Sequence, residues 1–306
     1  MKMCEKTDNQ INAKCLVTSD SVTVYHLRTD AAGRRLDVTK APYNAVGNGK
    51  AMDTQAIQKA VDDCNMGDVV YLPAGIYRTG ALRLHSNMEL YLEEGATLQG
   101  TDDPEDYLPR IFGEYEKPKT IPGRVRPRLI NISNCKNVRI SGLTLKDSAS
   151  WNVHMIYSEK IVTDHCTFHS EDVWNGDGWD PEGNVIGRPT TNIKIFDCIC
   201  AFGHGITIGS EMSSGVEDVK IWDCDMGNSL CGIEIKGTKK RGVYVRNVQV
   251  RDCKTARVLF HSVEYNDDGI GAKVSPLFED CTFENVWITG KCLDHDGRIT
   301  IGTAWN

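Results

Sequence analysis

Three short motifs carry side chains that could perform acid–base and electrostatic chemistry. Residues 175–180 read NGDGWD and supply the carboxylates of Asp177 and Asp180, while His204 lies between two glycines. Lys236 adds an ammonium group two residues after Glu234. All of these residues lie within copies of one repeating unit, so we expect them on successive rungs of a repeat structure.

The repeat is a short run of alternating apolar and polar residues. Period-two alternation predicts strands, and no helical runs separate them, which argues against a doubly wound sheet. Short strands repeated in this way predict an all-β solenoid, a single-stranded right-handed parallel β-helix; a sandwich or a propeller is the alternative. We expect one inward-facing ladder formed by Val138, Ile161, Ile193, Val219 and Val248.

Composition is that of an ordinary globular chain of 306 residues, with 25% charged and 40% hydrophobic residues. No apolar run is long enough to cross a membrane and the first residues carry no signal-peptide core, so we expect no membrane partner. Inward ladder positions explain the cysteines at the ends of the repeat strands better than disulfides do, and no cysteine pair has zinc-site spacing. We therefore expect no metal or cofactor. These ladder cysteines are Cys166, Cys198, Cys224, Cys253 and Cys281.

The N-terminal part predicts a cap for the open end of the solenoid. Residues 53–64 place Ala56, Ile57 and Val61 on one helical face, and Asp53 or Thr54 could serve as the N-cap. We interpret the whole of 1–306 as one domain, with an extension over 1–42, the cap and first coils over 43–110, and repeat coils over 126–290.

With these motifs in place, the chain resembles the polygalacturonase family, glycoside hydrolase family 28, from about Tyr43 to about Phe283. The family pattern is Asn-Thr-Asp, Asp-Asp, Gly-His-Gly, Arg-Ile-Lys and then a tyrosine. Asn175 and Asp177 match the first motif, and His204 matches the third. Lys236 matches the fourth, with Glu234 in place of the arginine.

The resemblance implies an inverting hydrolase of galacturonic-acid-containing (pectic) polysaccharide with no cofactor, no nucleic-acid partner and an undetermined oligomeric state. It implies catalytic roles for Asp177, Asp180 and His204. The substrate-binding candidates are Lys236, Tyr265, His154, Asn175 and Glu234. A secreted or periplasmic location follows from the resemblance, with a cytoplasmic one left open.

Two coils of the family pattern are missing from this sequence, one between Tyr107 and Arg128 and one between Asp177 and His204. The segment from Asp177 to His204 has room for one step of the solenoid, whereas the family has a further coil here that carries the Asp-Asp pair. Inverting hydrolysis needs two carboxyl groups roughly 6.5–9.5 Å apart. We therefore expect binding of acidic sugars with poor hydrolysis. A carbohydrate-binding pseudoenzyme is the alternative, and a calcium-dependent pectate lyase fits less well because of Gly-His-Gly.

Each candidate also has a purely structural interpretation. Asp177 could be a turn residue, and His204 could be an ordinary ladder histidine. Tryptophans could stack on sugar or fill the core; they are Trp151, Trp174 and Trp179. The pair Asp267-Asp268 reads as a turn and does not replace the missing Asp-Asp pair.

Overall fold

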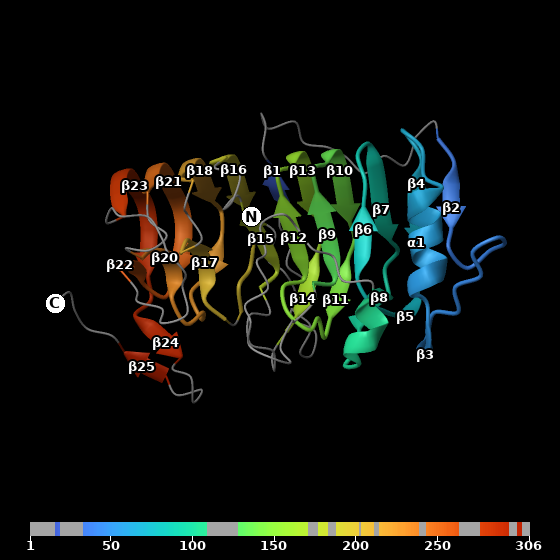
Figure 1. Cartoon of the computed structure of the whole chain (residues 1–306). Helices are drawn as coiled ribbons and strands as arrows, with labels where there is room; N and C mark the ends of the chain where they lie inside the picture. Colours follow the sequence, from blue (N-terminus) through green and yellow to red (C-terminus); the bar gives the residue numbers. More distant parts are fainter. Residues whose placement is uncertain are drawn as a thin grey trace.

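The computed structural model describes residues 16–18, 33–108, 128–170, 177–182, 188–201, 203–210, 214–238, 243–262, 276–293 and 299–301. Over these ranges the chain is almost entirely β-structure, and its coils stack side by side into an elongated solenoid (Figure 1). The predicted parallel β-helix is confirmed. No helix among the ranges that the structure describes is long and apolar enough to span a bilayer.

The coils are three-sided, and each contributes a strand to one long sheet. In spatial order this long sheet contains β19 (Asp225–Met226), β21 (Tyr244–Thr255), β18 (Val216–Trp222), β16 (Thr190–Phe196), β1 (Leu16–Thr18), β13 (Glu159–Asp164), β10 (Lys136–Ser141), β7 (Met88–Leu92), β4 (Val69–Leu72) and β2 (Arg35–Asp37), with β23 (Leu277–Ile288) also paired to β21.

Shorter sheets form the other two sides. The second side consists of β14 (Thr167–His169), β11 (Thr144–Lys146), β8 (Ala96–Gly100), β5 (Gly75–Thr79) and β3 (Asn48–Met52). The third side has a four-stranded sheet of β15 (Trp179–Glu182), β12 (Val153–Ile156), β9 (Ile130–Ser133) and β6 (Leu82–Leu84), and a three-stranded sheet of β17 (Gly205–Ile208), β20 (Gly232–Gly237) and β22 (Val258–Ser262). A separate antiparallel pair joins β24 (Lys291–Leu293) to β25 (Ile299–Ile301).

The sequence repeat is explained by left-handed backbone positions that recur in every coil, several of them within the strands of the long sheet. The residue before each ladder position has a positive φ, and so does the residue before each ladder cysteine. Asn and Asp tolerate this left-handed conformation better than most side chains, which explains why they recur there. The first set is Asn137, Lys160, Asn192, Asp218 and Asn247, and the second is His165, Asp197, Asp223, Asp252 and Asp280.

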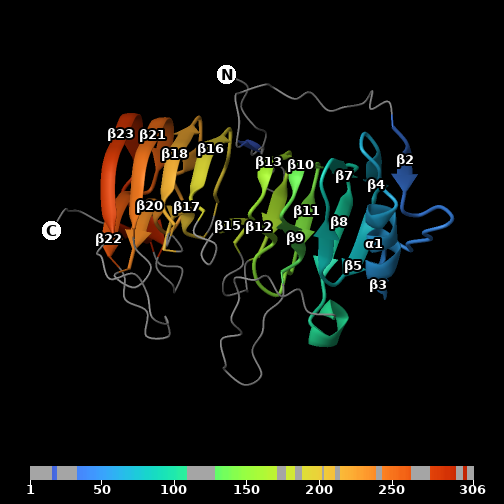
Figure 2. The ribbon, with the colours of Figure 1, turned by 45° about the horizontal axis from the view of Figure 1, so that its top comes forward.

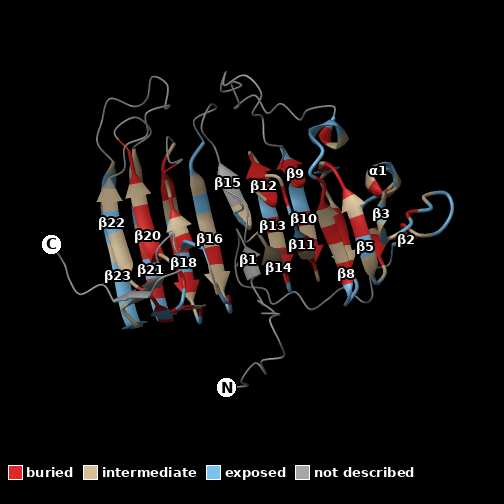
Figure 3. Ribbon diagram, turned by 90° about the horizontal axis from the view of Figure 1, so that it is seen from below, coloured by how far each residue is buried: buried red, intermediate tan, exposed pale blue. Residues whose placement is uncertain are grey.

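The inward ladder lies in the long sheet in the predicted register. Val138 pairs with Ile161 on one side of β1, and Val219 pairs with both Ile193 and Val248 on the other. Four of the five ladder residues are buried, and Ile193 is half-buried against the core. Figure 3 shows that buried and exposed residues alternate along the strands of the coils. The buried apolar residues form two clusters, over 36–166 and over 198–253, and Trp179 packs against both.

The ladder cysteines follow the prediction with one exception. Cys166, Cys224 and Cys253 are buried free thiols, and Cys281 is a half-buried free thiol. Cys198 is also buried, but it is disulfide-bonded. The expectation that ladder packing replaces disulfides is therefore wrong for Cys198.

The cap helix α1 (Thr54–Asp62) lies near the N-terminal end of the solenoid (Figure 1) and buries Ile57, Ala60 and Val61 in the first core cluster. Asp53 occupies the N-cap position, as predicted, but not with the expected side-chain contact. The Asp53 carboxylate makes no helix-cap hydrogen bond; it accepts the backbone N–H groups of Val46 and Gly47 at 2.7 and 3.0 Å. A single-turn 3-10 helix, Pro104–Tyr107, follows β8.

Strand β1 was not predicted, and it interrupts the stack. It lies antiparallel between β13 and β16, so that Val17 faces Thr163 on one neighbour and Ile195 on the other. Figure 2 shows it where the two halves of the long sheet meet. Two strand spacings, roughly 9–10 Å, therefore separate β13 from β16. Strands β15 and β17 belong to different sheets, and no strand in the described part of the chain pairs with both of them.

We predict that Val17→Pro destabilises the fold more than Val17→Ala. Proline removes a backbone donor from a strand that pairs on both sides, whereas alanine keeps it. An unsatisfied ladder acceptor costs about 1–3 kcal/mol of the free energy of unfolding. Urea unfolding of both variants measures the difference, and equal midpoints for the two would show that β1 does not hold the halves together.

Candidate active site

The predicted site residues lie on the third side of the coils, on two separate sheets. In the four-stranded sheet, His154 on β12 is in register with Asp180 on β15, and Asp177 precedes β15. In the three-stranded sheet, His204 precedes β17, and β20 carries Glu234 and Lys236. Parallel register makes residues one coil apart close neighbours, so each sheet brings its own set together.

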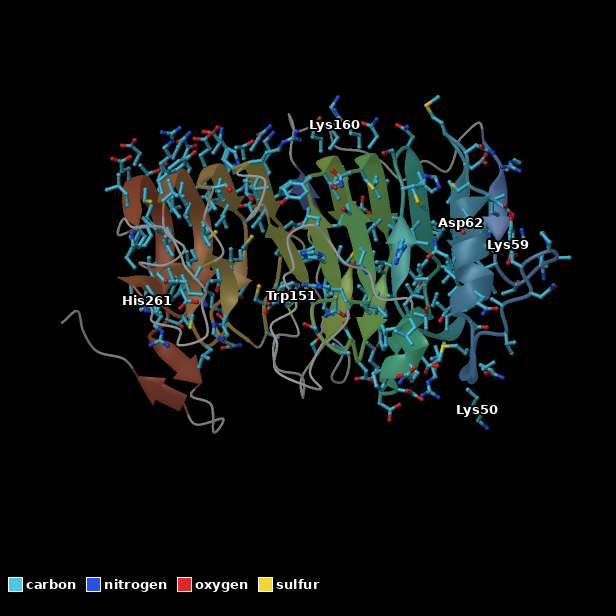
Figure 4. All side chains as sticks on the ribbon, in the orientation of Figure 1. Lys50, Lys59, Asp62, Trp151, Lys160 and His261 are labelled. Atoms are coloured by element: carbon cyan, nitrogen blue, oxygen red, sulfur yellow. The ribbon has the colours of Figure 1, made fainter. Side chains whose placement is uncertain are left out.

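Glu234 is the centre of the second set. Its side chain is only 4% exposed, and both carboxylate oxygens have partners. Oε2 accepts the Thr207 hydroxyl at 3.0 Å and lies 3.4 Å from both His204 Nδ1 and Lys236 Nζ. Oε1 lies 2.7 Å from His261 Nε2, which comes from β22 on the next coil. Figure 4 shows His261 at this end of the third side.

These contacts shift the ionisation of the cluster. Burial alone would raise the pKa of the Glu234 carboxyl, but hydrogen bonds and charges from His204, Lys236 and His261 hold it well below its usual range. The Cys231 sulfur and the Glu234 carboxylate raise the pKa of His204 to about 9, against the effect of burial. At neutral pH the cluster therefore contains an ionised carboxylate beside an imidazolium and an ammonium.

The turn that holds His204 is fixed by the next coil. The N–H of Leu230 donates to the Gly203 carbonyl at 2.7 Å, and the N–H of Cys231 donates to the His204 carbonyl at 3.2 Å. Gly205 has a φ of +93°, and a Cβ there would lie 2.2 Å from the Gly232 carbonyl oxygen. Glycine at 205 is thus required by coil packing as well as by the backbone conformation. The His204 side chain remains 52% exposed.

The structure does not bring Asp177 into the cluster around Glu234. The partners that it gives His204 are Glu234 and Cys231, whose Sγ lies 3.9 Å from Nδ1. Asp177 is exposed and its backbone carbonyl accepts the Asn152 N–H at 2.8 Å, on the far side of the interruption at β1. Its catalytic role, like that of Asp180, stays a prediction.

His154 lies in a closed environment. His154 is only 5% exposed, and its ring stacks on that of Trp151 with the two centroids 5.2 Å apart. The Arg128 guanidinium lies over the Trp151 ring, 4.4 Å from its centroid. Burial, together with the Arg128 charge, lowers the pKa of His154 to about 3. Figure 4 places Trp151 on the third side near β15.

Other sequence candidates have different outcomes. Trp179 packs edge-on against Phe168 at 4.3 Å and contacts both core clusters, so it fills the core. Asn175, Tyr265 and Trp174 lie outside the residues that the structure describes, as does the side chain of Asp180.

Sequence reasoning missed His261 and Cys231. His261 is the register partner of Lys236, and Cys231 precedes Gly232, the register partner of Gly205. Aligning each motif with the same position of the following coil would have identified both residues. The ligand atoms of His204, Cys231 and Glu234 lie within 4.8 Å of one another, which is close enough to share a metal ion.

We predict that Glu234→Gln lowers the pKa of His204 from about 9 towards its ordinary value near 6.5. The fall is incomplete because the Cys231 sulfur remains. Titration of the imidazole protons by NMR measures it, with Glu217→Gln as control because Glu217 pairs with Arg246 on the long sheet. An unchanged His204 titration in Glu234→Gln would contradict the contact.

We also predict that buried His154 makes stability fall in acid. The unfolded imidazole binds a proton below pH about 6.5 and the folded one only near pH 3, so the unfolded state gains the proton first. Its contribution is present above pH 6.5 and is lost at up to about 1.4 kcal/mol per pH unit as the pH falls. Urea unfolding between pH 4 and 7 should show a flatter slope for His154→Gln, and identical slopes would refute this.

Comparisons with known proteins show which family the chain resembles. Residues 184–266, which contain His204, Glu234 and Lys236, match the family described as Glycosyl hydrolases family 28. A probable polygalacturonase from Vitis vinifera is 30% identical over 287 residues, covering 68% of this chain and 58% of the relative. An exo-poly-alpha-D-galacturonosidase from Dickeya chrysanthemi is 33% identical, covering 47% of this chain and 25% of the relative. The chain thus matches roughly a quarter to three fifths of these relatives' lengths.

Solved structures share the fold. A polygalacturonase from Erwinia carotovora superposes with a TM-score of 0.63 at 21% identity, covering 88% of this chain and 89% of that one. An exopolygalacturonase of family 28 from Yersinia enterocolitica gives 0.62 at 20% identity, covering 83% and 65%. The chain is a member of the polygalacturonase family, glycosyl hydrolases family 28, with that family's right-handed parallel β-helix.

Proposed function

We propose that this chain binds pectic, galacturonic-acid-containing polysaccharide and hydrolyses it slowly as an inverting glycoside hydrolase. The observation that carries the proposal is the cluster of His204, Lys236 and His261 around Glu234, within the segment that matches family 28. The relatives' names, a probable polygalacturonase and an exo-poly-alpha-D-galacturonosidase, support the same substrate class. A secreted or periplasmic location belongs to the proposal, because the substrate is a polymer.

Local charge explains how a chain with a net charge of −7 can attract a polyanion. The Glu234 carboxylate is turned inward and its charge is balanced by its partners, so it does not repel a uronate. The imidazolium of His204, half exposed, and the ammonium of Lys236, 15% exposed, leave the cluster with a net positive charge towards solvent. A uronate carboxylate can pair with Lys236 as a point charge and accept a hydrogen bond from His204.

Slow turnover follows from the carboxyl groups. An inverting hydrolase needs one carboxyl group to protonate the leaving oxygen and a second to activate water. The coil that carries the Asp-Asp pair in the family is missing, which leaves Asp177 and Asp180, both on β15 or just before it. The step from β13 to β16 across β1 is wider than an ordinary rung. Loss of general acid–base assistance costs about 10²–10⁴ in rate.

The test measures binding and turnover of oligogalacturonides side by side. We predict that Lys236→Ala weakens binding about tenfold or more and removes most of its salt dependence, because a charge-assisted contact of about 1.5–3 kcal/mol is lost. Lys254→Ala is the matched control, since Lys254 pairs with Asp225 on the long sheet at the surface. A neutral galactose oligomer should bind weakly to all three proteins.

Product analysis separates the candidate functions. Slow release of reducing sugar, unaffected by chelator and abolished in Asp177→Asn, supports the hydrolase. Binding without any release assigns the alternative, a carbohydrate-binding pseudoenzyme. Unsaturated, ultraviolet-absorbing products that disappear with chelator would assign a calcium-dependent lyase. Absence of binding, with no effect of Lys236→Ala, would refute the proposal.

A further inference from the structure

We propose that His204, Cys231 and Glu234 form a binding site for a single zinc ion. Three different ligand types converge there: an imidazole nitrogen, a thiol sulfur and a carboxylate oxygen, all within 4.8 Å of one another. These are the ligand types that zinc prefers, and three protein ligands leave the fourth tetrahedral position free for water or another ligand. The inference does not depend on the proposed carbohydrate function.

The separations lie close to those of a tetrahedral ion. Ligand bonds of about 2.0–2.3 Å at tetrahedral angles put neighbouring donor atoms roughly 3.3–3.8 Å apart. His204 Nδ1 lies 3.4 Å from Glu234 Oε2, inside this range, and 3.9 Å from Cys231 Sγ, so the Cys231 side chain must move inward slightly to bind the ion. The ion would replace the hydrogen bonds that now join the three side chains, with Cys231 as the thiolate and His204 as the neutral imidazole.

The site is held in place before any ion binds. The Cys231 N–H donates to the His204 carbonyl at 3.2 Å, which fixes the two turns relative to each other. Thr207 donates to Glu234 Oε2 at 3.0 Å, and His261 Nε2 lies 2.7 Å from the opposite oxygen. Metal-binding carboxylates commonly have such outer partners, which fix their orientation. Cys231 and Glu234 are buried, while the half-exposed His204 gives the ion access from solvent.

Two cations oppose the ion and tune its affinity. Lys236 Nζ lies 3.4 Å from the same Glu234 oxygen, and Arg257 Nη2 lies 4.0 Å from Cys231 Sγ. Zinc must displace Lys236 from Oε2 and overcome its repulsion at short range. Bound zinc would also occupy Nδ1 of His204, so zinc and a uronate contact at this imidazole nitrogen would exclude each other.

The experiment uses the full chain, reduced and stripped of metal with chelator. Titration with Zn²⁺ should show one ion bound per chain, and Co²⁺ in its place should give the near-ultraviolet absorption of a thiolate–cobalt bond. Cys231→Ser should abolish that absorption and weaken zinc binding beyond the roughly 10–100-fold that loss of an outer partner costs. Cys281→Ser, which changes a half-buried free thiol elsewhere, is the control and should keep both signals.

A variant with the opposite expected effect guards against general damage to the fold. Lys236→Gln removes the competing ammonium and should tighten zinc binding about tenfold or more. The proposal is overturned if the stripped chain binds no zinc, if Cys231→Ser and Cys281→Ser bind equally, or if Lys236→Gln leaves the affinity unchanged.

Discussion

Stacking of parallel coils in register is the constraint on which the rest of this structure depends. Each coil places its side chains one strand spacing from the same positions of its neighbours, about 4.8 Å away. Left-handed Asn and Asp residues recur at matching positions of successive coils, as at Asp218 in β18 and Asn247 in β21. For this reason Glu234 contacts Thr207 from the preceding coil and His261 from the following one. The cluster around Glu234 therefore forms only when three successive coils stack in register.

At β1 the regular stacking of parallel strands is interrupted. The long sheet stays continuous because Leu16–Thr18 pairs with both neighbours in the antiparallel direction. The third side stays discontinuous, because β15 and β17 lie in different sheets. Trp179 packs against the core clusters of both halves and so helps to fill the junction. The interior is thus maintained across the gap, while the face that carries the polar motifs is divided.

Sequence alone predicted the features that repeat. Period-two alternation gave the strands and the ladder from Val138 to Val248, and the amphipathic pattern over 53–64 gave α1. It failed where an interaction joins segments outside the repeat. Strand β1 pairs with residues far along the chain, and the Asp53 carboxylate accepts hydrogen bonds from the N–H groups of Val46 and Gly47 instead of from the helix.

The candidate site was predicted in the same uneven way. His204, Glu234 and Lys236 were identified from their motifs, and the structure brings all three together. Their mutual arrangement was not predictable, because Glu234 was expected to bind substrate and is instead buried against His204, Lys236 and His261. His261 was not predicted because no sequence motif surrounds it. Its place in the site follows only from its register with Lys236.

The identity of residue 234 is coupled to that of its neighbours. The family pattern has arginine at this position, which would put a fixed cation beside His204, Lys236 and His261. Several cations within about 4 Å of one another in a partly buried site repel strongly. With glutamate, the same three side chains have a common anion, and His204 holds its proton up to about pH 9. Glu234 therefore replaces a fixed positive charge with an anion, and the net charge of the site then depends on whether His204 holds its proton.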